Sequence, residues 1–141
     1  MDIRPARRED VSELLDIYNY EVINGAATLD LNTRTLEEWY EWYDAHNKDN
    51  HPLIVGVEDG EITGYASLSE YRQKEAYKTT VELSIYVSPN HRKKGVGRAL
   101  MAHILEMAKN DAGTHCVVSV ITAGNEASTK LHAEFGFTCC G

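Results

Sequence analysis

Membrane-spanning segments are absent from these 141 residues, because no apolar run approaches the roughly 18 residues that cross a bilayer. The first residues are polar and charged, unlike a secretory signal, so we expect a cytoplasmic protein. Basic residues are also few, since 14 Lys and Arg stand against 22 Asp and Glu, for a net charge of −8. This balance argues against nucleic acid or an anionic membrane as a partner, because phosphate contacts need a broad basic face.

Cysteine and histidine are scarce and irregularly spaced. The three cysteines, Cys116, Cys139 and Cys140, lack Cys-x-x-Cys spacing, which favours reduced thiols over a disulfide framework. We expect Cys116 to be an inert core thiol in an apolar strand, while the other two lack a paired base, so no covalent enzyme intermediate is expected. The six histidines include no His-x-x-x-His pair, and no metal site is predicted.

The composition is that of an ordinary globular protein, with 43% hydrophobic and 26% charged residues, which excludes a disordered chain. A chain of this length buries about two-thirds of the surface that it exposes when unfolded. No internal repeat or linker divides it. We therefore expect a single domain over residues 1–141.

Two helices are expected in the first third of the chain. Apolar residues recur at helical spacing over residues 10–23 and predict the first helix. Thr35, followed three residues later by Glu38, is typical of a capping box and predicts the start of the second helix. The aromatic residues that follow share one helical face, and we interpret Trp39 as a core residue.

A hairpin and a third strand follow these helices. Residues 52–57 and 62–69 are short apolar runs on either side of the turn dipeptide Asp59-Gly60, which predicts an antiparallel hairpin. Over residues 80–87 apolar and polar side chains alternate, which predicts a strand with one buried face. Glu82 lies on the face opposite to the apolar side chains.

The last third is predicted to hold a helix, a strand and another helix. The third helix begins near Gly95, and residues 116–121 form a β-branched run that is typical of a buried strand. Residues 128–135 predict a short helix that Gly136 ends. The expected order is α-α-β-β-β-α-β-α, which indicates a mixed α/β or α+β domain.

Residues 87–98 form the most informative segment, VSPNHRKKGVGR, which runs from a strand end through a basic loop to a helix start. Successive backbone N–H groups there favour an anion site, and Gly95 and Gly97 let a phosphate approach the backbone closely. A tight turn with solvated lysines is the other interpretation. The Walker A pattern is missing, and Leu100 occupies the place of the third glycine of a dinucleotide fingerprint, which leaves Arg-x-x-Gly-x-Gly at residues 92–97.

This motif, placed after a mid-chain strand, resembles the acetyl-CoA loop of the GCN5-related N-acetyltransferase (GNAT) family. The resemblance extends over nearly the whole chain, because the order of helices and strands is also similar to the family's order. Within the family, the chain looks most like the phosphinothricin and methionine sulfoximine acetyltransferase branch. The stretches that carry this resemblance are Ile17-Tyr18-Asn19, Gly64-Tyr65-Ala66, Thr80-Val81-Glu82, Tyr86-Val87-Ser88-Pro89, Asn125 with Ser128, and Leu131-His132 leading to Gly136-Phe137.

The resemblance implies an α/β (α+β) fold with a mixed, mostly antiparallel central sheet flanked by helices. Members of the branch continue past the position of Gly141 with two more strands, so the chain resembles a member that lacks these strands. We expect an apolar edge near residues 117–121 to be uncovered, and exposed edges favour pairing with another chain. The expected outcome is either lowered stability or a homodimer that covers the edge.

The resemblance implies acetyl-CoA as the cosubstrate and no metal. The pantetheine arm would run along the strand end at Tyr86 and Val87, and an amide of that strand is the family's usual oxyanion donor. Asn125 and Ser128 match the family's contacts to the CoA arm, although Asn125 would also serve as a helix cap. The pyrophosphate would lie on the loop that contains Arg92, Lys93, Gly95, Val96, Gly97 and Arg98.

Two residues match catalytic positions of the branch. Glu82 matches its general base, which takes a proton from the incoming ammonium directly or through water. The ordinary glutamate pKa of about 4.3 is low for this task, so partial burial would have to raise it, and a glutamate on a solvated strand face is the alternative. His132 stands where many relatives carry a tyrosine that protonates the departing thiolate, and we favour a binding or orienting role for it over that of an acid.

Arg72 and Tyr77 match the substrate pocket of the branch. A guanidinium binds a carboxylate in a bidentate manner, so Arg72 predicts a small amino-acid-like acceptor with Tyr77 as a wall beside it, and a surface arginine is the alternative. We expect acetyl transfer to an amine or imine of the phosphinothricin or methionine sulfoximine type, by direct attack in a ternary complex. The alternatives are a protein N-terminal or lysine acetyltransferase and a catalytically impaired CoA-binding remnant.

Overall fold

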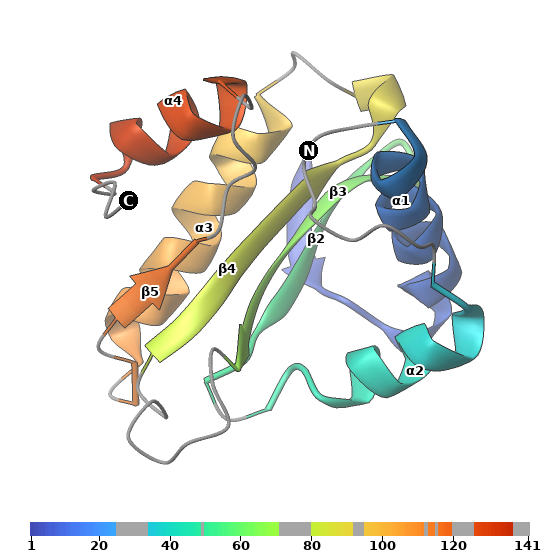
Figure 1. Ribbon diagram of the computed structural model, residues 1–141, viewed down its shortest axis with the longest axis horizontal. Coiled ribbons are helices and arrows are strands. Elements are labelled where there is room, and N and C mark those ends of the chain that lie inside the picture. The colour runs from blue at the N-terminus through green and yellow to red at the C-terminus, as the bar shows by residue number, and fades with distance from the viewer. Residues whose placement is uncertain are drawn as a thin grey trace.

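The structure is a computed structural model that describes residues 1–24, 34–48, 50–70, 80–91, 95–111, 113–114, 116–119 and 126–136. Its elements, in chain order and with η for a short 3-10 helix, are β1 (Asp2–Pro5), η1 (Arg8–Asp10), α1 (Val11–Asn24), α2 (Leu36–Asp44), β2 (Leu53–Glu58), β3 (Glu61–Glu70), β4 (Thr80–Val87), η3 (Pro89–His91), α3 (Val96–Asn110), β5 (Cys116–Val118) and α4 (Glu126–Glu134). The strands form a central layer, with α1 and α2 on one face and α3 on the other, and α4 lies beside α3 (Figure 1).

The five strands lie in sequence order from β1 at one edge to β5 at the other. Neighbouring strands are antiparallel except for β4 and β5, which are parallel. The expected mixed, mostly antiparallel sheet flanked by helices is confirmed. β5 pairs only with residues 80–82 of β4, although β4 continues to Val87. Beyond Glu82, no strand among the described residues pairs with β4 on that side.

Local signals place the helices as expected. The Thr35 hydroxyl accepts a hydrogen bond from the Glu38 N–H at 3.2 Å, and the Glu38 carboxylate accepts one from the Thr35 N–H at 3.1 Å. This reciprocal cap starts α2, whose Trp39 is buried. As predicted, α3 begins after Gly95, and α4 begins at Glu126, slightly before the predicted start.

The predicted hairpin is confirmed, because β2 and β3 pair in antiparallel fashion. Asp59 and Gly60 form its turn, with φ values of 53° and 78°. A turn with two residues at positive φ matches the right-handed twist of the strands, which explains the Asp-Gly pair. The alternation over β4 is also confirmed, since Val81 and Leu83 are buried on the α3 side while Glu82 is half-buried on the other face.

The sequence pattern misses one strand, β1, at the polar start of the chain. Ile3 is its contribution to the core, so β1 shows no run of alternating apolar residues, and backbone pairing with β2 is what forms it. The Arg4 guanidinium donates to both carboxylate oxygens of Asp10, at 2.7 and 3.1 Å, and ties β1 to the residue that precedes α1. Asp10 also accepts a hydrogen bond from the Arg7 N–H at 2.7 Å.

These contacts change the acidity of Asp10. Burial by itself would raise the pKa of the carboxyl, but the hydrogen bonds from Arg4 and from the Arg7 N–H outweigh burial, and the pKa is lowered. The ionised carboxylate is therefore part of what stabilises the fold.

β5 differs from the expectation of a buried strand. Cys116 is exposed, and Val117 and Val118 are half-buried. The physical reason is position, because β5 is the edge of the described sheet and pairs on one side only. The prediction that Cys116 is a core thiol is therefore wrong, and residues 120–121, Cys139 and Cys140 lie outside the described residues.

Two apolar clusters hold the sheet between the helices. On the α3 side, Leu100 and Ile104 are fully buried and pack with Leu68 and Val81 of the strands. On the α1 and α2 side, Leu14 packs with a group of aromatic residues. Each fully buried Leu or Ile side chain stabilises the fold by about 1.5–3 kcal/mol, so these clusters fix β3 and β4 from both faces.

Candidate functional site

The first part of the candidate site is the start of α3. Gly95 caps this helix with a φ of 78°, in the left-handed region where an L residue is strained. Its carbonyl oxygen accepts a hydrogen bond from the Ala99 N–H at 3.0 Å, and Val96 is buried and anchors the turn. The N–H groups of residues 96–98 lie in the first helical turn, where no intrahelical acceptor exists. With the positive end of the helix dipole, they are suited to bind an anion.

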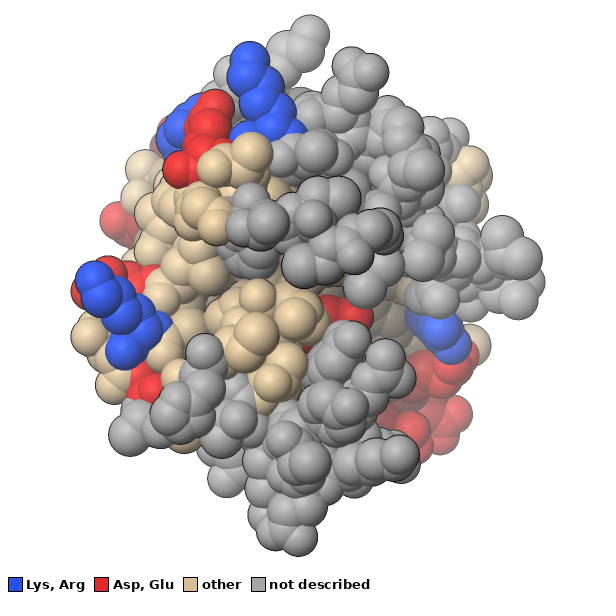
Figure 2. All heavy atoms as spheres, turned by 60° about the vertical axis from the view of Figure 1, so that its left-hand side comes forward, with Lys and Arg blue, Asp and Glu red and all other residues tan. Residues whose placement is uncertain are grey.

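The end of β4 and α4 lie beside this turn. A Cβ atom built on Gly97 would lie 3.6 Å from Val87 Cγ2 and 3.5 Å from Leu131 Cδ2. The Arg98 guanidinium forms an ion pair with the Glu134 carboxylate, which links α3 to α4. Figure 2, which turns the side of α3 and α4 forward, shows basic and acidic atoms next to one another at the margin. The first turn of α3, the end of β4 and the last helix therefore meet in one place.

Glu82 lies in β4 between Ser69 of β3 and Val118 of β5. Its side chain is half-buried, and burial raises the pKa of the carboxyl above its ordinary value. Glu82 is also the last residue of β4 that pairs with β5, so it stands where the two strands separate. A carboxylate with a raised pKa beside such a break in strand pairing is suited to accept a proton.

Aromatic rings line the same face of the sheet. The Tyr86 ring lies 5.2 Å from Tyr65 and 5.7 Å from Tyr18, measured between ring centroids. Trp39 packs on Tyr18 at 4.9 Å and on Trp42 at 4.2 Å. The Tyr65 hydroxyl is buried and has no hydrogen-bond partner in the described part of the chain, and burial raises its pKa well above the ordinary value. These five rings, named here the aromatic wall, come from α1, α2, β3 and β4 and pack into an apolar cluster between the sheet and the two helices.

His132 brings an imidazole to the residue that follows β5. It is buried in α4, and its Nε2 atom lies 2.9 Å from the Ser119 hydroxyl oxygen. Ser119 follows Val118, which is the partner of Glu82 in the sheet. His132 therefore reaches the segment that directly follows β5.

Several predicted site residues lie outside the described residues, namely Arg72, Tyr77, Arg92, Lys93 and Asn125. Ser128 belongs to α4, but only its backbone is described. The remaining predicted residues fall on β4, on the first turn of α3 with its cap, and on α4. They are Glu82, Tyr86, Val87, Gly95, Val96, Gly97, Arg98 and His132.

A polar pair beside Glu82 carries no signal in the sequence. His46, just after α2, is buried, and its Nε2 atom lies 2.7 Å from the hydroxyl oxygen of Ser69. Ser69 stands opposite Glu82 in the sheet. The two partners are 23 residues apart, and no spacing rule links them, so only the fold reveals the pair.

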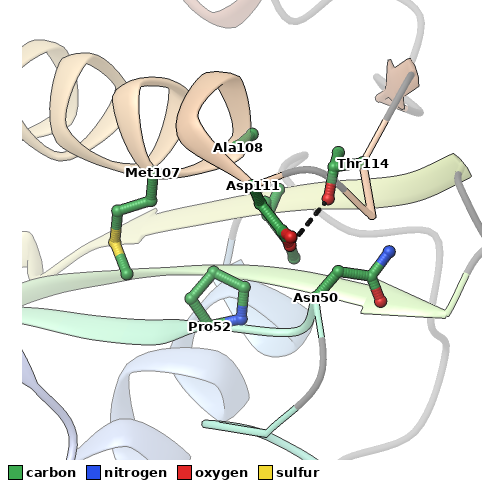
Figure 3. A pocket seen from close by; sticks show the side chains of 7 residues that line it. Asn50, Pro52, Met107, Ala108, Asp111 and Thr114 are labelled. Carbon is green, nitrogen blue, oxygen red and sulfur yellow. Dashed lines mark hydrogen bonds between the residues drawn. The ribbon is translucent and has the colours of Figure 1, made fainter.

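A pocket elsewhere is separate from this site. It measures about 160 Å³ and lies between the end of α3 and the segment before β2, where Asp111 and Pro52 line it (Figure 3). The Asp111 carboxylate accepts a hydrogen bond from the Thr114 hydroxyl at 3.1 Å. Leu68, which also lines the pocket, belongs to the α3 face of the sheet, whereas Glu82 lies on the opposite face.

The described site offers a carboxylate, an imidazole and the backbone N–H groups of a helix start. Among the described residues, no group of three or more His, Cys, Asp or Glu side chains could hold a metal ion. Within the same ranges, no helix combines the length and the apolar character needed to cross a bilayer.

Known proteins are similar to this chain in both sequence and fold. The acetyltransferase (GNAT) family model matches residues 13–137. An L-methionine sulfoximine/L-methionine sulfone acetyltransferase of Salmonella typhimurium is 37% identical over 138 residues, which are 98% of this chain and 80% of the relative. The crystal structure of a ribosomal-protein-alanine N-acetyltransferase from Brucella melitensis has a TM-score of 0.94 and 38% identity, over 100% of this chain and 86% of that one. A phosphinothricin acetyltransferase from Sinorhizobium meliloti in complex with acetyl-CoA has a TM-score of 0.92 and 30% identity, over 99% and 76%.

Proposed function

The chain belongs to the acetyltransferase (GNAT) family and is an acetyl-CoA-dependent N-acetyltransferase, and we propose that its acceptor is the amine or imine nitrogen of a small amino-acid-like compound. Methionine sulfoximine and phosphinothricin represent this class, because relatives at 37% and 30% identity are named for them. The observation that carries the proposal is the half-buried Glu82 at the strand break, on the strand whose end reaches the start of α3.

Acetyl-CoA fits the described residues at the start of α3. A Cβ atom built on Gly95 would meet no atom of the described residues within 4 Å, so none of these residues crowds the helix start where a phosphate group would approach its N–H groups. We propose that Tyr86 and Val87, which no described strand covers on the β5 side, bind the pantetheine arm. The residues proposed to bind the pyrophosphate are Arg92, Lys93, Gly95, Val96, Gly97 and Arg98. Asn125 and Ser128 are further proposed contacts. When bound, acetyl-CoA supplies the acetyl group as a thioester.

Glu82 is the proposed general base. An acceptor amine enters as an ammonium ion and must lose a proton before its nitrogen can attack. The Glu82 carboxylate takes up that proton, directly or through water. Because burial raises its pKa, the carboxylate is a stronger base than an exposed glutamate and is protonated over a wider acid range. Activity should therefore rise with pH through the pKa of Glu82.

Two further groups are proposed to act at the thioester. A backbone N–H at the end of β4, near Val87, donates to the carbonyl oxygen as negative charge develops there. This donor is fixed in advance, because β4 pairs with β3 along its length and does not reorganise during the reaction. His132, held near Ser119, binds and orients the departing thiol.

Arg72 and Tyr77 are the proposed substrate-binding residues. A guanidinium forms two parallel hydrogen bonds with a carboxylate, which suits an amino-acid-like acceptor. Tyr86 and Trp42, the half-buried rings of the aromatic wall, lie on the side of the sheet that Glu82 faces, so an acceptor placed there would meet apolar rings. A small, largely apolar side chain on the acceptor is the chemistry that these rings favour.

A protein N-terminus is the second candidate acceptor. A solved structure with 38% identity is named a ribosomal-protein-alanine N-acetyltransferase. The α-amine of a protein has an amide next to it in place of a free carboxylate. Arg72→Ala therefore separates the two candidates, because it should raise KM for an amino-acid acceptor and leave KM for a peptide acceptor unchanged. Phosphinothricin, methionine sulfoximine and a peptide that begins with alanine are the acceptors to compare.

We also propose that residues 1–141 form one domain and that the protein is a homodimer. β5 is the edge of the described sheet, and Val117 and Val118 are only half-buried on it. Such an edge favours pairing with another chain. Light scattering should give twice the chain mass of 15.8 kDa, and a stable monomer would contradict the dimer.

The cytoplasmic location expected from the sequence stays a prediction.

Glu82→Gln tests the proposed function. Thiol release from acetyl-CoA is measured with methionine sulfoximine and phosphinothricin, and acetyl-CoA binding is measured by calorimetry on the same sample. Loss of the base should lower kcat/KM about 10²–10⁴-fold and leave binding unchanged. Glu58→Gln, which neutralises an exposed carboxylate on β2, is the matched control and should change neither quantity. Unchanged turnover in Glu82→Gln would contradict the role of base, and binding without turnover in the unmodified protein would indicate a different acceptor.

A further inference from the structure

His46 is a buried imidazole with two close polar partners. Only 7% of the residue is exposed. Its Nδ1 atom lies 2.7 Å from the Trp42 carbonyl oxygen, and its Nε2 atom lies 2.7 Å from the Ser69 hydroxyl oxygen. The ring also packs against Trp42, with centroids 4.7 Å apart. Both ring nitrogens are therefore satisfied inside the protein.

The carbonyl partner decides which ring nitrogen carries the hydrogen. A carbonyl oxygen can only accept, so Nδ1 donates to Trp42. In the neutral ring, Nε2 then carries no hydrogen and accepts one from the Ser69 hydroxyl. Burial lowers the pKa of His46, the Trp42 hydrogen bond opposes this, and the nearby His51 lowers it further. His46 is accordingly neutral near pH 7, and the Ser69 hydrogen points toward it.

Ser69 is at the same time the cross-strand neighbour of Glu82. The two residues are directly opposite in the antiparallel pair of β3 and β4. Directly opposite residues project to the same face, with Cβ atoms about 4.5–5.5 Å apart. Ser69 has a single hydroxyl hydrogen, and His46 accepts it. The Ser69 hydroxyl therefore has no hydrogen left to donate to Glu82, and only lone pairs of its oxygen can face that carboxylate.

We propose that His46 is a positioning residue for Glu82, because by accepting the Ser69 hydroxyl hydrogen it withholds from the Glu82 carboxylate a donor that would stabilise the negative charge. The inference rests on the proposed function, in which Glu82 is the base. A donor would stabilise the ionised carboxylate and weaken it as a base. His46 thereby keeps Glu82 basic through Ser69, without a hydrogen bond to Glu82 itself.

Other groups on this face define the electrostatic setting. Burial is the cause that raises the pKa of Glu82, so a donor from Ser69 would act on a partly desolvated charge. Val118, its neighbour on β5, is apolar. The other titratable groups on α1, α2, β3 and β4 and just ahead of β2 that the structure describes as buried or half-buried are Tyr18 and Glu21 on α1, Tyr40 and Tyr43 on α2, Tyr65 on β3, Tyr86 on β4, and His51 ahead of β2.

Carbon-13 NMR titration of the Glu82 carboxyl tests the inference without reference to turnover, with Glu82→Gln to identify the resonance. His46→Phe keeps a ring beside Trp42 but removes the acceptor, so Ser69 can turn its hydrogen toward Glu82. The midpoint of the Glu82 titration should then move to a proton concentration about two- to tenfold higher, which is the effect of one hydrogen bond. An unshifted titration in folded His46→Phe would overturn the inference.

Ser69→Ala makes the test specific and does not depend on the folding of the His46 variant. Ser69 donates to His46 and not to Glu82, so its loss should leave the Glu82 titration within about twofold of the unmodified protein. A clear shift toward alkaline pH would mean that Ser69 already donates to Glu82, and it would refute the inference. Combining His46→Phe with Ser69→Ala should return the titration to its original position, whereas a purely structural role of His46 predicts a shift that persists.

Turnover separates a failure of this inference from a failure of the proposed function. If Glu82 is the base, His46→Phe moves the acid limb of the kcat/KM profile to lower pH, in parallel with the NMR titration. Normal turnover in Glu82→Gln, together with the expected NMR pattern, would refute the base and leave the hydrogen-bond arrangement standing. Loss of turnover in Glu82→Gln without the NMR pattern would support Glu82 as the base and refute the role of His46.

Discussion

Replacing Gly64 with alanine should destabilise the protein and disturb the strand that carries the candidate site. Gly64 lies on β3 opposite Val87 of β4. A Cβ atom built there would lie 2.7 Å from the Tyr86 carbonyl oxygen, 3.2 Å from Val87 Cα and 3.2 Å from Leu100 Cδ1. Two of these three atoms belong to the backbone of β4, which cannot rotate away as a side chain can.

The size of the effect follows from these distances. Ordinary contact begins at 3.4 Å, so the Tyr86 oxygen has to recede by about 0.7 Å. Overpacking of a well-packed core costs about 1–3 kcal/mol, and the smaller entropy of an unfolded chain with alanine offsets about 0.4–1 kcal/mol of it. The expected net loss of unfolding free energy is about 1–2 kcal/mol. For a domain of this size, it corresponds to a fall in Tm of about 3–6 °C.

Urea unfolding followed by circular dichroism measures this loss. Gly113→Ala is the matched control, because its added Cβ atom would meet Asp111 Oδ1 at 3.5 Å, an ordinary contact, and it should change the unfolding free energy by less than about 0.5 kcal/mol. Gly64→Ala should also raise KM for acetyl-CoA, since Tyr86 and Val87 are the proposed pantetheine contacts. A Gly64→Ala protein as stable as the control would refute the reasoning.

Three further substitutions test the fold and the start of α3. Asp10→Asn should destabilise the protein by about 1–3 kcal/mol at pH 7, because it removes a charged hydrogen-bond acceptor of Arg4. The pKa of Asp10 is lower in the folded protein than in the unfolded chain, so its contribution to stability is complete above the unfolded pKa of about 3.9 and is lost as pH falls through the folded pKa. Acid unfolding curves that coincide for Asp10→Asn and the unmodified protein would contradict this. Thr35→Ala should cost about 1 kcal/mol in urea unfolding through loss of the α2 cap, and an unchanged midpoint would show that the cap contributes nothing. The Cβ atom that Gly95→Ala adds meets no described atom within 4 Å, so the expected loss of about 1–2 kcal/mol in unfolding free energy comes from the strain of an L residue in the left-handed region. Calorimetry should also show weaker acetyl-CoA binding. Stability and affinity equal to those of the unmodified protein would argue against this account of the cap.

Interactions between near neighbours explain the elements that the sequence predicts. The cap at Thr35 and the turn at Asp59-Gly60 each depend on atoms a few residues apart, so the residue types alone indicate them. The alternation that puts Glu82 opposite to Leu83 is equally local, because successive side chains of a strand point to opposite faces. Residue types within a few positions of one another are enough to predict such features.

Pairing between distant segments explains what the sequence pattern misses. β1 contributes only Ile3 to the core and forms because β2 supplies its backbone partners 49 to 55 residues later. Cys116 belongs to a β-branched run, but its exposure depends on β5 being the edge of the described sheet. No pattern within either segment contains this information.

For the candidate site, the sequence by itself determined the chemical groups, namely the Glu82 carboxylate, the His132 imidazole and the glycine loop at Gly95. Only the tertiary structure decided their surroundings: the burial that raises the pKa of Glu82, the break between β4 and β5 beside it, and the hydrogen bond by which His46 holds the Ser69 hydroxyl. The reason is physical. Residue type sets a group's intrinsic chemistry and its local geometry, whereas desolvation and hydrogen bonding depend on which distant segments the fold packs around it.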